Sequence, residues 1–184
     1  MTSRLKLELP TTIGADREFA INVDLDEAFG DEWLFGKIGY VIGNTLVGDY
    51  NLGASLRDVL LQMHLIFSDA GKRETSRFVG KGSDDLFDTV WSTLYGDGRN
   101  GLEDVANEEC WAKHDITIPI DVFDNVRVFQ FDEGAVSRII WKAIGENMDE
   151  SVHEVVTPRG ATEQVFQRLH DLLESLVEWE NLRR

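Results

Sequence analysis

The single cysteine and one of the four histidines have a spacing that would suit a shared metal ion. Cys110 and His114 are four residues apart, so their side chains would lie on one face of a helix. A structural zinc ion needs four ligands, and the sequence offers no second cysteine or histidine pair beside this one. We therefore predict no metal here. His64 and His170 fall within amphipathic segments, where we expect them at the edge of the apolar face.

A short loop has the two-glycine spacing of a phosphate-binding loop, and it runs from Gly48 to Ser55. The position that should carry the phosphate-binding lysine is Ala54, and Asp49 adds a negative charge to the loop. We therefore predict no nucleotide or other cofactor, and we interpret the two glycines as a tight turn between a strand and a helix.

Carboxylates also gather before the first aromatic-rich segment, at Asp24, Asp26, Glu27, Asp31 and Glu32. A calcium loop of the EF-hand type would need an oxygen ligand where Ala28 stands and glycine where Phe29 stands. The sequence also lacks the G-x-S-x-G motif of a serine hydrolase. We therefore assign no catalytic residue, although pairs among the 34 acidic side chains leave a carboxylate-dependent hydrolase as an alternative.

The most acidic part of the chain lies between positions 97 and 133. It carries ten acidic residues against three basic ones, a net charge of −7, and it includes Trp111 and Phe123. Acidic and aromatic side chains interleaved on loops suit the docking of a basic protein. The alternative is a solvated loop region whose charge serves solubility alone. Our candidate contact residues are Asp97, Glu103, Asp104, Glu108, Glu109, Trp111, Asp121 and Asp124.

The whole chain is 184 residues long and has a formal net charge of −16. This charge argues against binding to nucleic acids or anionic membranes, because phosphate affinity depends on lysine and arginine. One cysteine permits no internal disulfide bond, and no segment has the run of about 20 apolar residues that spans a bilayer. The start, Met1 to Pro10, lacks the apolar core of a secretion signal, so we expect a cytoplasmic protein of undetermined oligomeric state.

Hydrophobic periodicity predicts which elements position these residues. Alternation predicts a strand over Phe19–Leu25, and a second strand over Trp33–Ile42 leads through a Gly43-Asn44 turn to a short strand at Leu46-Val47. Residues 1–17 are expected to be irregular. Further strands are predicted over Ile116–Ile120, Val126–Phe131 and Val152–Val156.

Helical spacing predicts four helices, with Ser55, Ser83 and Thr162 as N-caps. They begin after Ser55, at Ser83, at Glu133 (ending at Glu146) and at Thr162. Because strands and helices do not alternate regularly, we predict one α+β domain over residues 1–184. It would contain an antiparallel sheet of about five to six strands packed with about four helices.

Four short motifs resemble those of bacterial immunity proteins of the family called immunity protein 42. They are Trp33-Leu34-Phe35-Gly36, Gly48-Asp49-Tyr50, Ser55-Leu56-Arg57-Asp58 and Arg138-Ile139-Ile140-Trp141. The block between Trp33 and Leu60 is the distinctive one, and the likeness extends in order over most of Phe19 to Leu173.

The resemblance implies a cytoplasmic protein that binds and neutralises a cognate toxin domain of a contact-dependent growth-inhibition or related polymorphic toxin system. It implies no catalytic residues and no cofactor. From the charge we expect a basic toxin domain, for example a nuclease, to meet an acidic surface. A non-catalytic adaptor or regulatory module is the alternative.

Overall fold

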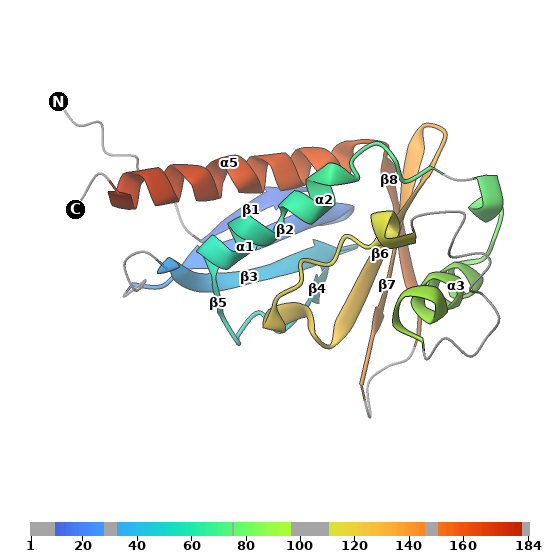
Figure 1. The fold of residues 1–184 in the computed structure, drawn as a ribbon, viewed down its shortest axis with the longest axis horizontal. Helices are drawn as coiled ribbons and strands as arrows, with labels where there is room; N and C mark the ends of the chain where they lie inside the picture. The colour runs from blue at the N-terminus through green and yellow to red at the C-terminus, as the bar shows by residue number, and fades with distance from the viewer. Residues whose placement is uncertain (1–9, 28–32, 75, 97–110, 146–150, 182–184) are drawn as a thin grey trace.

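The computed structural model describes residues 10–27, 33–74, 76–96, 111–145 and 151–181. Its described strands form two antiparallel sheets, one of five strands and one of three. Figure 1 shows the long C-terminal helix lying along the five-stranded sheet and a shorter helix beside the three-stranded sheet. The predicted α+β class is confirmed, but the strands are divided between two sheets instead of forming one.

The five-stranded sheet has the order β1-β2-β3-β4, and β5 pairs with the other end of β3. The turn between β3 and β4 is the predicted one, because Gly43 and Asn44 both have the positive φ angles (59° and 66°) that tight hairpins require. The strands are β1 Thr11–Gly14, β2 Phe19–Leu25, β3 Phe35–Ile42, β4 Thr45–Val47 and β5 Ala54–Ser55.

The expectation of an irregular start is wrong for Thr11–Gly14, which forms β1. This strand pairs with β2, and the Thr12 hydroxyl donates a 2.7 Å hydrogen bond to Asn22 Oδ1. Only Ile13 is buried among its four residues, so the segment has too little apolar alternation to be recognised as a strand.

The three-stranded sheet contains β6 Val126–Glu133, β7 Val136–Ala143 and β8 His153–Pro158. The helix predicted from Glu133 to Glu146 is therefore wrong. Ile139 faces the core beside the five-stranded sheet, whereas Ile140 faces a second core on the other side. Because both faces of β7 are buried, its apolar residues do not alternate with polar ones, and their spacing resembles that of a helix.

The strand predicted over Ile116–Ile120 is also wrong, although the segment lies close to β6. It makes a single bridge, from Asp115 to Phe129, and does not continue as a ladder. The Tyr40 hydroxyl instead donates to the Ile116 carbonyl at 2.8 Å and accepts from the Ile118 amide at 3.2 Å. A buried tyrosine thus supplies the hydrogen bonds that a neighbouring strand would have provided.

The described α-helices are α1 Leu56–Gln62, α2 His64–Ser68, α3 Ser83–Tyr95 and α5 Ala161–Asn181. The predicted cap of α1 is confirmed, because Ser55 Oγ accepts a hydrogen bond from the Asp58 amide. The other two caps are wrong. Gly82 precedes the first turn of α3, Ser83 Oγ donates to Glu154, and Thr162 is buried inside the first turn of α5.

Two hydrophobic cores lie on opposite sides of the three-stranded sheet. The first lies between the five-stranded sheet and α5, where Tyr40 contacts Phe123 with ring centroids 4.4 Å apart. The second lies between the three-stranded sheet and α3, where Phe87 packs on Phe129 at 5.0 Å. Each fully buried apolar side chain contributes roughly 1.5–3 kcal/mol, so packing on both faces holds the three-stranded sheet in place.

Candidate interaction surface

The structure places the predicted contact residues in three different settings. Asp97, Glu103, Asp104, Glu108 and Glu109 lie outside the described residues. Trp111 is only 4% exposed and packs edge-on against Phe78, so its side chain belongs to the second core. Asp121 and Asp124 are exposed, and both line a surface groove.

A short 3₁₀ turn, Asp121–Phe123, begins at Asp121 and is followed directly by Asp124. Val122 and Phe123 are buried, and the Val122 carbonyl accepts a 2.8 Å hydrogen bond from the Asp49 amide. Because the two apolar side chains enter the core, the two carboxylates on either side remain in solvent. Neither carboxylate has a hydrogen bond or ion pair within the described part of the chain.

The first groove, of about 200 Å³, lies between the end of α3 and this turn. It contains three carboxylates and one guanidinium. Its lining residues are Tyr95, Asp115, Thr117, Ile118, Pro119, Ile120, Asp121, Phe123, Asp124 and Arg127.

A tyrosine, a carboxylate and a guanidinium form one wall of the first groove. The Tyr95 hydroxyl donates to Asp115, whose other oxygen accepts from the Thr117 amide at 2.8 Å. The Arg127 guanidinium lies over the Tyr95 ring, 5.0 Å from its centre, and donates to the Phe123 and Val126 carbonyls. Burial, and then the charge of Asp115, raises the pKa of Tyr95 to about 12. The phenol therefore stays protonated and serves as a donor and a stacking surface, not as a base.

A second groove, of about 260 Å³, adjoins the first and contains no basic side chain among its lining residues. The segment from Pro119 to Asp121 lines both grooves and separates them. The other lining residues, from β5 and α1 and the loop before them, are Gly53, Ala54, Ser55, Asp58 and Gln62. We call the two grooves together the acidic surface, because Asp58, Asp115, Asp121 and Asp124 supply its charge.

The loop with phosphate-loop spacing has a structural role beside this surface. Gly48 has φ +98°, and a Cβ there would lie 2.8 Å from the ring of Phe123. Tyr50 lies over Gly39, where a Cβ would approach its ring to 3.1 Å. The Gly48-Asp49-Tyr50 motif therefore supports the 3₁₀ turn and covers the sheet, which agrees with the interpretation of these glycines as a tight turn.

A second family motif, Arg138-Ile139-Ile140-Trp141, joins the three-stranded sheet to α3. Arg138 Nε donates to Glu154 Oε1 at 2.6 Å, and Arg138 Nη1 donates to the Lys81 carbonyl at 2.9 Å. The hydrogen bond from Arg138 holds the pKa of Glu154 below its usual value, although partial burial opposes this shift. The charged residue of this motif thus positions α3, and its two isoleucines enter the two cores.

A buried polar network lies away from the acidic surface, and sequence patterns gave no sign of it. Arg73 is 1% exposed, and its Nη1 donates to Glu163 Oε1 at 2.9 Å while its Nη2 donates to the Ile66 carbonyl at 2.8 Å. Gln130 Nε2 bridges Glu163 and Asp132, which also accepts from Ser137 Oγ at 2.7 Å. Burial lowers the pKa of Arg73, and the charges of Glu163 and Asp132 oppose the shift. This network joins α5, β6, β7 and the segment that follows α2.

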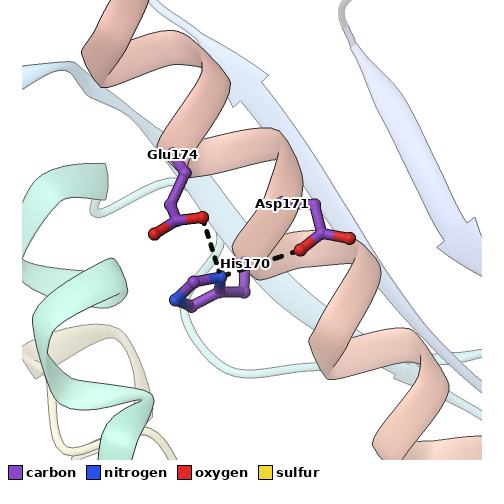
Figure 2. A group of neighbouring side chains, drawn as sticks. All are labelled: His170, Asp171 and Glu174. Atoms are coloured by element: carbon purple, nitrogen blue, oxygen red, sulfur yellow. Dashed lines mark ion pairs between the residues drawn. The ribbon is translucent and has the colours of Figure 1, made fainter.

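One group of side chains on α5 has donor atoms close enough to share a metal ion. His170, Asp171 and Glu174 each offer one ligand atom within 4.8 Å of the others. Figure 2 shows the imidazole of His170 between the two carboxylates. His170 Nδ1 lies 3.5 Å from Glu174 Oε2 and 3.8 Å from Asp171 Oδ1, and its ring meets Phe67 edge-on. Three donors from one helical turn are fewer than the four of a structural zinc site. The arrangement is that of a surface ion pair, formed when the imidazole is protonated.

The fold and its surface define an α+β protein with an open acidic surface, on which the carboxylates of Asp121 and Asp124 have no hydrogen bond or ion pair to the residues that the structure describes. The family model for immunity protein 42 matches residues 11–172. The chain therefore belongs to the immunity protein 42 family. No curated protein matches the sequence.

A solved structure confirms the fold. The crystal structure of CdiI from Burkholderia dolosa AUO158 is similar to this chain with a TM-score of 0.69 at 17% sequence identity. The alignment covers 86% of this chain and 97% of that chain. Within the described ranges, no helix combines the length and the apolar character that crossing a membrane would require.

Proposed function

We propose that this protein binds and neutralises a cognate toxin domain in the bacterial cytoplasm, and that it acts by binding without catalysing a reaction. Membership of the immunity protein 42 family, over residues 11–172, is the observation that carries this proposal. The similarity in fold to CdiI supports a place in a contact-dependent growth-inhibition system.

We further propose that the acidic surface faces a basic region of the toxin, such as the substrate cleft of a nuclease. Asp121 and Asp124 support this because their charges are not neutralised by a partner within the described part of the chain. Carboxylates that face a cationic cleft accelerate association through long-range attraction. Asp97, Glu103, Asp104, Glu108 and Glu109 lie outside the described residues and stay predicted contacts of the toxin domain.

The test is growth rescue during co-expression with the toxin domain encoded beside the gene for this chain. The wild-type chain should restore growth. The double variant Asp121→Lys/Asp124→Lys should bind the toxin at least about tenfold more slowly at low salt, because it reverses two charges in the encounter region. Asp16→Lys/Asp171→Lys, a matched reversal at exposed sites that line neither groove, is the control.

The salt dependence of the association rate tests how much long-range electrostatic attraction contributes to toxin binding. Between about 50 and 500 mM salt, the association rate of the wild type should fall more than about tenfold, since the Debye length shrinks to a few ångströms. Failure of the wild type to rescue growth or bind the toxin would overturn the proposed function. Rescue with a salt-insensitive association rate would remove the acidic surface from the mechanism.

A further inference from the structure

The two grooves of the acidic surface differ in whether they already hold a cation of this chain. In the first groove the guanidinium of Arg127 lies over Tyr95, among Asp115, Asp121 and Asp124. This groove therefore already contains a guanidinium, an aromatic ring and carboxylates. The second groove has carboxylates but no basic lining residue.

The second groove is lined by carboxylates from two elements and by small residues. Asp58 on α1 and Asp121 on the 3₁₀ turn bring carboxylates from two separate elements. Gly53, Ala54 and Ser55 are small residues that also line the groove. Their backbone is held in place, because β5 pairs with Phe35 and Gly36 of β3 and Ser55 caps α1. The groove is therefore present before any partner binds, which lowers the entropy cost of binding.

Three exposed leucines lie close in sequence to residues that line the second groove. Leu61 follows Asp58 by three residues on α1, so these two side chains project from one side of that helix, and Leu65 lies on α2. Their exposed fractions are 61% and 49%, and Leu52, which directly precedes Gly53, is 57% exposed. Exposed apolar side chains beside a polar groove are typical of the centre of a binding surface.

We infer that the second groove receives a lysine or arginine side chain of the toxin domain. Asp58 and Asp121 bind its cationic head, and Leu52, Leu61 and Leu65 cover the apolar residues around its stem. A long basic side chain joins an apolar stem to a charged end, and this combination matches the leucines and carboxylates of the groove. This inference rests on the proposed function and names the contact that anchors the complex.

Two sets of substitutions test it, with the cognate toxin domain as the probe in surface plasmon resonance. Asp58→Asn/Asp121→Asn should raise the Kd at least about 30-fold, since it removes both partners of a charge-assisted contact. Leu52→Ser/Leu61→Ser/Leu65→Ser should raise the dissociation rate at least about tenfold and leave the association rate within about twofold, because apolar anchors act after encounter.

The controls are substitutions of the same type elsewhere on the described surface. Asp16→Asn/Asp171→Asn and Val79→Ser, at a residue that is 66% exposed, should change the Kd by less than about twofold. Circular dichroism and the midpoint of thermal unfolding verify that each variant is folded. Where the triple leucine variant unfolds, the single variant Leu61→Ser replaces it.

A scan of the toxin locates the partner side chain. One lysine or arginine of the toxin, replaced by alanine, should couple with Asp58→Asn/Asp121→Asn by at least about tenfold in a double-mutant cycle. If the wild type binds tightly while both groove variants bind equally well, the groove inference is wrong and the proposed function stands. If the wild type does not bind the toxin, both fail together.

Discussion

The buried polar network and the acidic surface use the same kinds of side chain in opposite ways. In the network Glu163 and Asp132 each lie against a donor or a cation, and Arg73, Gln130 and Ser137 supply them. On the acidic surface Asp121 and Asp124 are exposed and lack such partners within the described residues. Acidic residues therefore serve folding in one region and face outward in the other. What separates the regions is the presence of partners, not the number of charges.

The network is not fully satisfied among the described residues, and this makes it sensitive to substitution. Arg73 Nε, Gln130 Oε1 and Glu163 Oε2 are buried without a hydrogen-bond partner in that part of the chain. Each such atom has lost its hydration without regaining an equal contact. Removing one charged member should therefore cost more than the loss of a single contact.

The largest expected effect comes from Arg73→Ala. This change leaves Glu163 without its cation and the Ile66 carbonyl without a donor, so the free energy of unfolding should fall by about 3–5 kcal/mol. Urea denaturation followed by circular dichroism measures the loss. Arg159→Ala is the control, because Arg159 lies at the solvent-facing end of the same network and should cost only a small fraction of this. Equal losses of stability in the two variants would mean that burial does not make Arg73 more important for folding than Arg159.

An intermediate effect is expected from Gly48→Ala, which tests whether packing holds the acidic surface in place. The new Cβ would press on the Phe123 ring at a positive φ, and the free energy of unfolding should fall by about 2–4 kcal/mol.

The matched control for this variant is Gly134→Ala. Gly134 also has a positive φ, +60°, but has no atom within 4 Å of the added carbon, so the expected loss is about 1 kcal/mol. Similar losses in the two variants would show that the backbone conformation alone, without the contact with Phe123, sets the cost.

The smallest effect on stability is expected from Asp121→Asn/Asp124→Asn. Because neither carboxylate has an internal partner in the described part of the chain, the free energy of unfolding should change by less than about 0.5 kcal/mol. The association rate with the toxin domain should nevertheless fall, as it should for the lysine variant. A stability loss comparable with that of Arg73→Ala would mean that these carboxylates contribute to folding as the buried polar network does, and the contrast between the two regions would be wrong.

Sequence patterns predicted the elements whose signal is contained in a few neighbouring residues. The strand Phe19–Leu25, the Gly43-Asn44 turn and the Ser55 cap are examples, because each depends on local alternation or a local hydrogen bond. Residues 136–143 were misassigned because Ile139 and Ile140 enter different cores, and this arrangement depends on tertiary packing that local spacing does not report.

The candidate site was predictable in part for the same reason. The acidic composition led to Asp121 and Asp124, which line the first groove, but not to Asp58, which lies more than 60 residues earlier and joins them only in the fold. Trp111 was selected for its acidic neighbours, yet its large apolar side chain packs on Phe78 in the second core. Composition indicates the sign of the charge on a surface, whereas contacts between residues far apart in sequence decide which side chains lie on it.

The three-stranded sheet has a consequence for how the molecule comes apart. Since β7 sends Ile139 to one side and Ile140 to the other, it is a wall common to two interiors. Exposing either core to water would require β7 to move, and this would expose the other core as well. We therefore expect α3 and α5 to unfold in one cooperative transition, and the loops that carry the acidic surface to unfold with them.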